Sequence, residues 1–348
     1  MENQHVVPIY MSIERPDYRE IVDFVEHQLQ SAVGVKKVSI ILSHTISNVG
    51  ELFHCGKPAF DFSRGHDGNW YEKLYLFSSY FYVLKGFKRL ENNNLLAPNV
   101  AVFFNSSSFP ESLLCEFFRA KNTVTYSLQH GMYLRPAKIT YDIVNIANVT
   151  ADNLLCWGDF SKSEVENFYL DNKLSRKFQC KVAGYPKPLV HLQQDKLVTD
   201  KVLVVLPRLI YKKESINLLE LLIELEFRER LVVKLHPSLL HDKDIIGACE
   251  RLGAIVPEGK LLDCLTGVQY FATVGFNTTS LFECLSNSRR ILVYNSGSDE
   301  FDLNCFESFR NSEELKSLIA LEGELQPSFD YFFSSLPDGY TNSILHNL

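Results

Sequence analysis

Two short sequences between residues 231 and 294 decide the fold expected for this chain: Leu231-Val232-Val233-Lys234-Leu235-His236-Pro237 and Val274-Gly275-Phe276-Asn277-Thr278-Thr279-Ser280-Leu281-Phe282-Glu283. The first is an apolar, β-branched run that predicts a buried strand, and the His-Pro pair ends it with an imidazole at its carboxyl end. The second predicts a strand over 270–274, a glycine turn, and a helix that Asn287 and Ser288 close. In an open parallel sheet, both sequences lie at carboxyl ends of strands, where ligands bind.

The second sequence has the features of an anion site. The start of its helix would offer backbone N–H groups, the hydroxyls of Thr278, Thr279 and Ser280, and the positive end of the helix dipole. The same side chains are also typical of a helix cap without further function. Together with His236, they predict a cradle for a phosphate group.

Length and composition limit the class of protein. The chain has 348 residues, of which 46% are hydrophobic and 22% charged, which favours two domains over one. A formal net charge of -7 argues against a nucleic-acid partner. Eight cysteines are spread singly, which favours reduced thiols and a cytoplasmic location. Residues 1–15 do not resemble a signal peptide, and no apolar stretch is long enough to span a membrane.

Strands and helices are expected to alternate along the whole chain. The predicted strands are 37–42, 100–104, 123–128, 153–157, 178–183, 201–206, 231–235, 254–256, 270–274 and 290–294. The predicted helices are 18–32, 70–91, one opened by Pro110, one capped by Ser161 with Glu164 in a capping box, 215–225, 243–252, 260–266 and 329–336. This alternation predicts an α/β protein with two doubly wound parallel sheets.

Five short motifs then carry a resemblance to a known family. They occur in order as Gln129-His130-Gly131, Cys156-Trp157-Gly158, Gly184-Tyr185-Pro186-Lys187, Lys234-Leu235-His236-Pro237 and the turn from Gly275 to Glu283. Over roughly residues 100–300, the series resembles bacterial surface-polysaccharide glycosyltransferases of the GT-B fold. It is most similar to the branch with polysialyltransferases, capsule Kdo transferases and teichoic-acid glycerophosphotransferases.

The resemblance implies two Rossmann-like domains facing a central cleft. We expect an acceptor-binding domain over residues 1–190 and a nucleotide-donor domain over 200–325. A C-terminal helical segment, residues 326–348, would return to the first domain. The strand and helix order agrees with this division.

The donor side of such an enzyme would lie in the second domain. The resemblance implies that His236 and the Thr278-Thr279-Ser280 turn bind the phosphate of a nucleotide donor, with a modest preference for a cytidine nucleotide. Glu283 could accept a hydrogen bond from a ribose hydroxyl, or only favour the helix dipole. The other donor-side candidates are Arg208, Pro237 and Asn277.

His130 is the candidate catalytic base. The histidine of the Gln-His-Gly sequence is similar to the proposed base of the glycerophosphotransferases, which implies that His130 deprotonates an acceptor hydroxyl. No carboxylate adjoins it in sequence, so its orienting partner is expected elsewhere, at Asp142 or Asp159. Acceptor-side candidates in loops after early strands are His44, Arg64, His66, Asp67 and Asn105, for which an ordinary solvated loop is the alternative.

No metal is expected. The acidic run Asp299-Glu300-Phe301-Asp302 does not directly follow a strand, and a helix-start phosphate site makes a cation less necessary. The preferred function is therefore metal-independent transfer of a sugar from a nucleotide-sugar donor to a surface glycan, as in capsule, lipopolysaccharide or O-antigen. The alternatives are a CDP-polyol phosphotransferase, a nucleotide-sugar 2-epimerase and a non-catalytic nucleotide-sugar-binding assembly subunit.

The acceptor implied by the resemblance is an oligosaccharide or a lipid-linked glycan. A lipid-linked acceptor would bring the chain to the inner face of the membrane as a peripheral protein. The aromatic and basic segment 70–89 could contribute to such an association, although core packing explains its aromatic residues equally well.

Overall fold

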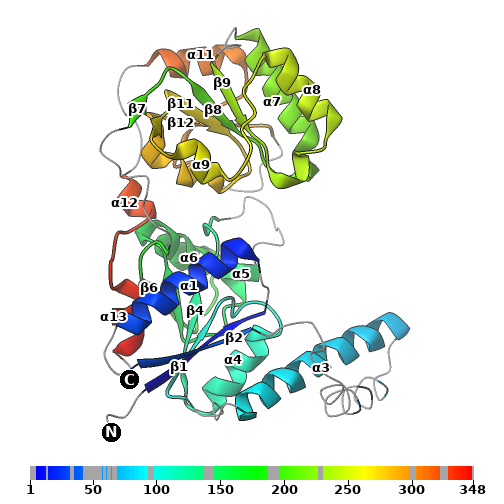
Figure 1. Cartoon of the computed structure of the whole chain (residues 1–348), viewed down its shortest axis with the longest axis vertical. Coiled ribbons are helices and arrows are strands. Elements are labelled where there is room, and N and C mark those ends of the chain that lie inside the picture. Colours follow the sequence, from blue (N-terminus) through cyan, green and yellow to red (C-terminus); the bar gives the residue numbers. More distant parts are fainter. Residues whose placement is uncertain are drawn as a thin grey trace. The chain divides into compact units, whose positions relative to one another are not determined.

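The chain divides into two compact units (Figure 1). The N-terminal unit consists of residues 1–133, 141–187 and 333–348, and the C-terminal unit consists of residues 134–140 and 188–332. The computed structural model describes residues 5–12, 15–31, 35–41, 57, 60, 64, 69–92, 98–135, 144–186, 196–225, 230–297, 303–321 and 328–346.

The N-terminal unit contains a parallel sheet with the strand order β2-β1-β3-β4-β5-β6. Its strands are β1 (His5–Met11), β2 (Val35–Ile41), β3 (Val100–Phe103), β4 (Val124–Leu128), β5 (Asn153–Cys156) and β6 (Gln179–Val182). The chain begins in β1, places β2 on one side of it, and then adds β3 on the other side. The switch in direction therefore lies between β1 and β3, and ligands bind at such points in open α/β sheets.

Helices cover both faces of this sheet. The described helices of this unit are α1 (Pro16–Ser31), α3 (Trp70–Asn92), α4 (Glu111–Ala120), α5 (Val144–Ala147), α6 (Asp159–Asp171) and α13 (Gly339–Leu345), and Phe87 of α3 packs against Phe117 of α4. The strand register places Tyr10, Phe103 and Leu154 on one face, where α4 and α6 pack. On the opposite face, the Tyr126 hydroxyl donates to the carbonyl of Ser343 in α13, which packs against α1 (Figure 1).

The C-terminal unit contains a second parallel sheet with the order β13-β12-β11-β8-β9. Its strands are β8 (Val202–Val205), β9 (Leu231–Lys234), β11 (Ala272–Gly275), β12 (Ile291–Tyr294) and β13 (Glu307–Phe309), and β7 (Leu197–Val198) pairs separately with β10 (Val268–Gln269). A parallel bridge from Val232 to Ile255 extends the sheet beyond β9. With that bridge as a minimal third strand, the order is that of the doubly wound dinucleotide-binding fold, with its switch point between β8 and β11.

One face of the second sheet carries the main apolar core. Side chains of α7 (Lys212–Glu224), α8 (Lys243–Leu252) and α11 (Ser312–Ala320) pack there against residues such as Val204, Val233 and Val274. The remaining helical segments are α9 (Leu261–Leu265), α10 (Ser280–Glu283), α12 (Phe329–Phe332) and the 3-10 turns η3 (Leu209–Tyr211), η4 (Pro237–Leu239) and η5 (Leu285–Asn287). The predicted class, α/β with two doubly wound parallel sheets, is confirmed.

Several local predictions need correction. Strands β1 and β13 were not predicted, and β13 adds to β12, which corresponds to the last predicted strand, 290–294. Residues 254–256 form only a bridge. The segment predicted as one helix over 329–336 contains the short α12, whose residues belong to the C-terminal unit, whereas α13 packs on α1 in the N-terminal unit.

Candidate functional site

Three predicted donor-side segments leave the C-terminal sheet at the same edge. Gly275 of β11 is in register with Val205 of β8, and Val205 with Lys234 of β9. Two residues further along each chain are Asn277, Pro207 and His236, followed by Arg208 after β8. The structure therefore brings Arg208, His236 and the Asn277–Ser280 turn to the carboxyl ends of three adjacent strands, around the switch point.

Hydrogen bonds fix the ring of His236. Its Nδ1 accepts the backbone N–H of Ser238 at 3.1 Å and lies 2.9 Å from the Ser238 hydroxyl. That hydroxyl oxygen accepts the N–H of Leu209 at 3.0 Å, which leaves its own hydrogen free to point at Nδ1. With Nδ1 as an acceptor, the neutral ring carries its proton on Nε2, so Nε2–H is a donor.

Pro237 and Arg208 lie in the short segments that follow β9 and β8. Pro237 is exposed and opens η4, for which His236 is the N-cap residue. Arg208 is exposed and has the corresponding position before η3. Because Ser238 also binds Leu209, the segments after β8 and β9 are held to each other beyond the sheet.

The turn after β11 is tighter, and its helix shorter, than predicted. A Cβ added at Gly275 would lie 2.7 Å from the carbonyl oxygen of Val205, so only glycine fits there. Asn277 is buried and has a left-handed φ of 44°, a conformation that asparagine tolerates better than most residues. The Thr278 hydroxyl accepts the N–H of Ser280 at 3.3 Å.

Helix α10 covers only Ser280–Glu283 before η5 begins. Its N-cap residue, Thr279, makes no capping side-chain hydrogen bond, and Glu283 is partly buried. A single helical turn has a small dipole, so the predicted contribution of the dipole to anion binding is reduced. The polar hydrogens of the turn remain as the groups that could bind a phosphate.

In the N-terminal unit, Gln129 fixes the backbone around His130. The buried Gln129 side chain donates to the Gly131 carbonyl at 2.7 Å and to the Ser161 hydroxyl at 2.9 Å, and it accepts the N–H of Trp157 at 2.7 Å. Ser161 lies inside α6, whose N-cap residue is Gly158, so the predicted capping box of Ser161 and Glu164 is wrong. The Ser161 hydroxyl instead accepts a hydrogen bond from the side chain of Gln129, which directly precedes His130.

The ring of His130 lies among aromatic side chains. Its centroid is 5.4 Å from that of Phe104, 6.0 Å from that of Tyr133 and 6.1 Å from that of Tyr18. Burial lowers the pKa of His130 from 6.5 to about 4, a hydrogen bond with the Leu128 backbone acts in the opposite direction, and the charge of Arg15 lowers the pKa further. The ring is therefore neutral at neutral pH, as a base must be before it accepts a proton.

The expected orienting carboxylate of His130 is not found among the residues that the structure describes. The Nδ1 atom of His130 is buried without a hydrogen-bond partner. Asp159 is an exposed residue at the start of α6, and Asp142 lies outside the described residues. A hydrogen bond with the Leu128 backbone and the aromatic packing, in place of a carboxylate, hold the ring.

The acceptor-side candidates do not converge in the described part of the chain. Asn105 has its side chain engaged locally: its Oδ1 accepts the N–H of Ser107 at 3.0 Å, and its Nδ2 donates to the Ser108 hydroxyl at 2.9 Å. Arg64 is exposed. His44, His66, Asp67 and the acidic run 299–302 lie outside the described residues.

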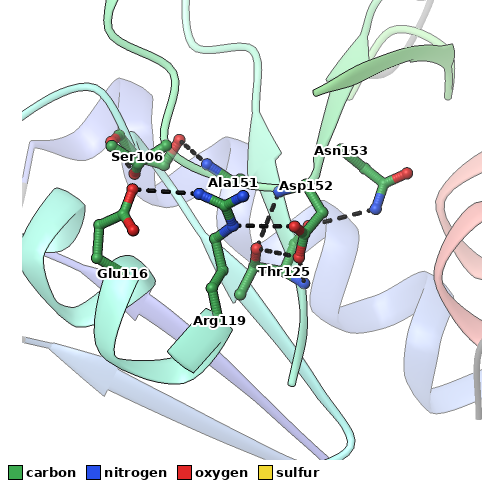
Figure 2. A network of polar contacts seen from close by, with 8 residues as sticks. Ser106, Glu116, Arg119, Thr125, Ala151, Asp152 and Asn153 are labelled. Carbon is green, nitrogen blue, oxygen red and sulfur yellow. Dashed lines mark hydrogen bonds and ion pairs between the residues drawn. The ribbon is translucent and has the colours of Figure 1, made fainter. Parts of the chain in front are cut away.

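Figure 2 shows a polar network that anchors the loop after β3. The carboxylate of Asp152 accepts the Thr125 hydroxyl at 2.7 Å and the Arg119 Nε at 2.9 Å. Next to it, the Thr150 hydroxyl donates to the carbonyl of Ser106 at 2.7 Å. The loop from Asn105 to Ser108 is thereby joined to the segment that precedes β5.

Two residues missed by the sequence analysis occupy central positions. Ser238 could have been noticed, because a serine two residues after a strand-ending histidine is typical of a local side-chain turn. Glu111, fully buried at the start of α4, gave no signal, because an acidic residue there usually interacts with the helix dipole in solvent.

Within the described residues, no group of three or more His, Cys, Asp or Glu side chains is placed to hold a metal ion. Among the described helices, none has the length and apolar character needed to cross a membrane.

The fold defined by these two units is that of GT-B-type enzymes, and comparison with solved structures supports this class. The lipopolysaccharide outer core galactosyltransferase WaaB, in its apo form, is similar with a TM-score of 0.55 and 10% identity, over 98% of this chain and 99% of its own. The complex of S. aureus MnaA with UDP gives a TM-score of 0.56 at 10% identity, over 97% and 94%. The UDP-N-acetylglucosamine 2-epimerase of Rickettsia bellii gives 0.50 at 11% identity, over 99% and 94%.

At these identities, the likeness shows a shared fold. No protein-family model and no curated protein matches the chain. The predicted GT-B fold class is thus confirmed, and the activity has to be argued from the residues.

Proposed function

We propose that this protein is a glycosyltransferase that moves a sugar from a nucleotide-activated donor to a glycan acceptor. The observation that supports the proposal most is the convergence of Arg208, His236 and the Asn277–Ser280 turn at one edge of the C-terminal sheet. A guanidinium, an imidazole N–H donor and a polar turn are the groups that bind a diphosphate or phosphate without a metal ion. The switch point between β8 and β11 is where a doubly wound sheet binds a nucleotide.

The proposed reaction needs one base and one site for the leaving group. His130 would take the proton of an acceptor hydroxyl, whose oxygen forms the new bond to the anomeric carbon of the sugar. The bond from that carbon to the donor phosphate breaks, and the electron pair leaves with the phosphate oxygen. His236 Nε2–H and Arg208 would stabilise the negative charge that grows on the departing nucleotide.

The finer assignment is a CMP-sugar donor and a surface glycan acceptor, as in the polysialyltransferase, Kdo transferase and glycerophosphotransferase branch. It is supported by the His236-Pro237 and Thr278-Thr279-Ser280 sequences. Because MnaA was solved with UDP, uridine nucleotides have to be tested beside cytidine nucleotides.

Calorimetry of nucleotide binding tests the proposal. CMP, CDP, UDP and GDP are titrated into the wild type, His236→Ala and the control His241→Ala, which removes an exposed histidine of the same unit. We expect one nucleotide to bind, and His236→Ala to weaken it by about 1–3 kcal/mol, the scale of a lost hydrogen bond to a charged group. Absence of binding by all four nucleotides, or equal affinities in the wild type and His236→Ala, would contradict the donor site.

A nucleotide-sugar 2-epimerase is the second candidate, because the similar structures include UDP-N-acetylglucosamine 2-epimerases. An epimerase would convert a nucleotide sugar without an acceptor. NMR of UDP-N-acetylglucosamine incubated with the protein alone decides between the two: a new epimer signal supports the epimerase, whereas turnover only with a glycan acceptor supports the transferase.

A lipid-linked acceptor would bring the protein to the inner face of the membrane. The first turn of α3 supports this part of the proposal, because Trp70 and Tyr71 are 62% and 67% exposed and Lys73 lies beside them. Aromatic and basic side chains of this kind favour the interface of an anionic bilayer. Cosedimentation with anionic vesicles should be weaker for Trp70→Ala than for the wild type, and equal pelleting would count against the association.

A further inference from the structure

Glu111 is a charged side chain that the proposed reaction does not use. It is the first residue of α4 and is fully buried. Burial raises the pKa of Glu111 from 4.5 to about 7, while hydrogen bonds from Asn105 and Ser12 act in the opposite direction. Burial of a carboxylate costs free energy unless hydrogen bonds replace its lost hydration.

The carboxylate joins two strand ends. One oxygen accepts the backbone N–H of Ser12 at 2.8 Å and the Ser12 hydroxyl at 2.7 Å. The other oxygen accepts the backbone N–H of Asn105 at 2.6 Å. Ser12 directly follows β1, and Asn105 comes shortly after β3. Because the segments after β1 and β3 diverge at this switch point, the backbone N–H groups of Ser12 and Asn105 need a partner other than the neighbouring strand.

The two segments that Glu111 joins carry aromatic residues that lie against His130. Phe104 immediately precedes Asn105, and Tyr18 lies in the first turn of α1, which follows Ser12. The two rings touch each other, with centroids 4.6 Å apart, and both lie against the ring of His130. Arg15 packs over Tyr18 with its guanidinium carbon 4.3 Å from the ring centroid.

We propose that Glu111 is a positioning residue for His130: its carboxylate fixes the ends of β1 and β3, so that Phe104 and Tyr18 hold the imidazole in one orientation. The aromatic contacts act beside the hydrogen bond between the ring and the Leu128 backbone, because Nδ1 itself has no hydrogen-bond partner. The catalytic consequence rests on the proposed function, because it takes His130 as the base. The effect of Glu111 on the orientation of the His130 ring does not depend on the proposed function.

Glu111→Gln is the appropriate substitution. Glutamine has the same shape, but its amide offers one acceptor oxygen and one donor nitrogen, so it cannot accept the N–H groups of both Ser12 and Asn105. The matched control is Glu116→Gln, on the exposed side of the same helix, where the carboxylate forms an ion pair with Arg119 (Figure 2). Ser12→Ala is the milder variant, because it removes one of the three hydrogen bonds to Glu111.

The test is NMR of histidine-labelled full-length protein at pH 8, above the pKa of Glu111, with the His130 signal assigned from His130→Gln. The three surrounding rings shift the His130 ring signal away from that of an exposed histidine. We expect this displacement to shrink in Glu111→Gln, to shrink less in Ser12→Ala, and to persist in Glu116→Gln. If Glu111→Gln fails to fold, Ser12→Ala alone decides. A His130 signal that stays at its wild-type position in the folded variant overturns the proposal.

Activity separates this inference from the proposed function. With a donor and acceptor in hand, kcat of Glu111→Gln should fall about tenfold, as expected for a misplaced base, while the donor KM stays within about twofold of the wild type. A moved His130 signal without any transferase activity would leave the positioning role intact and contradict the proposed reaction. Transferase activity together with a His130 signal that Glu111→Gln does not move would support the proposed reaction and contradict the positioning role of Glu111.

Discussion

The hydrogen bonds of His236 determine which form of the imidazole a phosphate would meet. Nδ1 accepts from the backbone and hydroxyl of Ser238, which leaves the donor on Nε2. Ser238→Ala keeps the backbone bond and removes the hydroxyl that also binds Leu209. We expect a loss of nucleotide affinity of about 0.5–1.5 kcal/mol, smaller than for His236→Ala, measured by calorimetry.

The control for this prediction is Ser317→Ala, because Ser317 is exposed on α11 and binds only a carbonyl of its own helix among the described contacts. Nitrogen NMR of His236 should report a proton on Nε2 in the wild type. A proton on Nδ1 would contradict the geometry, whatever the affinity.

His130 should make stability depend on pH. Its pKa is about 4 in the folded protein, because burial disfavours the charged ring, against 6.5 as the usual value. Below 6.5 the unfolded chain takes up a proton that the folded chain refuses, so the contribution of neutral His130 to stability is complete above 6.5 and is lost as the pH falls towards 4. The difference amounts to roughly 3 kcal/mol.

Urea unfolding at several pH values measures this effect. The free energy of unfolding of the wild type, taken relative to His130→Gln, should fall between pH 6.5 and pH 4 and stay constant above pH 6.5. Parallel curves for the wild type and His130→Gln would show that His130 titrates normally.

The sequence predicted the position of His236 at the sheet edge better than the surroundings of the Asn105 side chain. His236 follows a strand end, and the register of parallel strands then fixes its edge of the sheet. Asn105 also follows a strand, but its amide is engaged in a local turn with Ser107 and Ser108. Which of these two outcomes a polar loop residue has depends on the path of the loop, which the sequence does not specify.

At the scale of elements, Gly275 sets the distance between β11 and β8. An alanine Cβ would lie 2.7 Å from the Val205 carbonyl oxygen and 3.0 Å from Leu281. Gly275→Ala should therefore lower the stability of the C-terminal unit by about 1–3 kcal/mol and weaken nucleotide binding, because the turn after β11 has to move. Urea unfolding and calorimetry on the same samples check both effects.

Gly247→Ala is the matched control. Gly247 lies within α8, and an added Cβ would find its nearest neighbour at 3.8 Å, the end of the flexible Arg251 side chain. Alanine should stabilise this helix by about 0.5–1 kcal/mol. If both alanine variants behave alike, the steric account of Gly275 is wrong.

The two strands missed from the sequence, β1 and β13, have different physical causes. Strand β1 contains Pro8, which argues against a central strand, yet β1 pairs with β3 only at Ile9 and Tyr10, so Pro8 needs a ladder partner on one side only. Strand β13 is too short to show a pattern. Long apolar runs such as β9 were predicted within a residue, because burial on both faces leaves them little freedom.

At the scale of the whole molecule, the alternation of strands and helices was enough to predict two doubly wound sheets. It could not predict the order of strands, because the side on which each new strand joins the sheet depends on packing between distant segments. The switch points, between β1 and β3 and between β8 and β11, follow from that order. The shared sheet edge of His236 and the turn after β11 could thus be predicted from motifs, whereas the contacts of Glu111 became visible only with the topology.

The C-terminal segment is an integral part of the N-terminal unit. Tyr340 is fully buried: its hydroxyl donates to the Gly184 carbonyl at 3.0 Å, its N–H donates to the Gln28 side chain at 3.2 Å, and its ring lies edge-on to Phe24. Tyr340→Ala should therefore destabilise the N-terminal unit by about 3–5 kcal/mol, the usual loss for a large aromatic core residue. Tyr331→Ala, at a side chain that is 43% exposed, should cost about 0.5 kcal/mol.

Two probes separate the units in this last experiment. Trp157 is buried against Tyr185 and Phe333 in the N-terminal unit, so its fluorescence in a Trp70→Phe background follows the unfolding of that unit. Nucleotide affinity follows the C-terminal unit, and it should stay within about twofold in folded Tyr340→Ala, because a lost core contact acts on the unit that contains it. A large loss of nucleotide affinity with unchanged Trp157 unfolding would mean that the returning segment supports the donor site, and that the two units depend on each other for their folding.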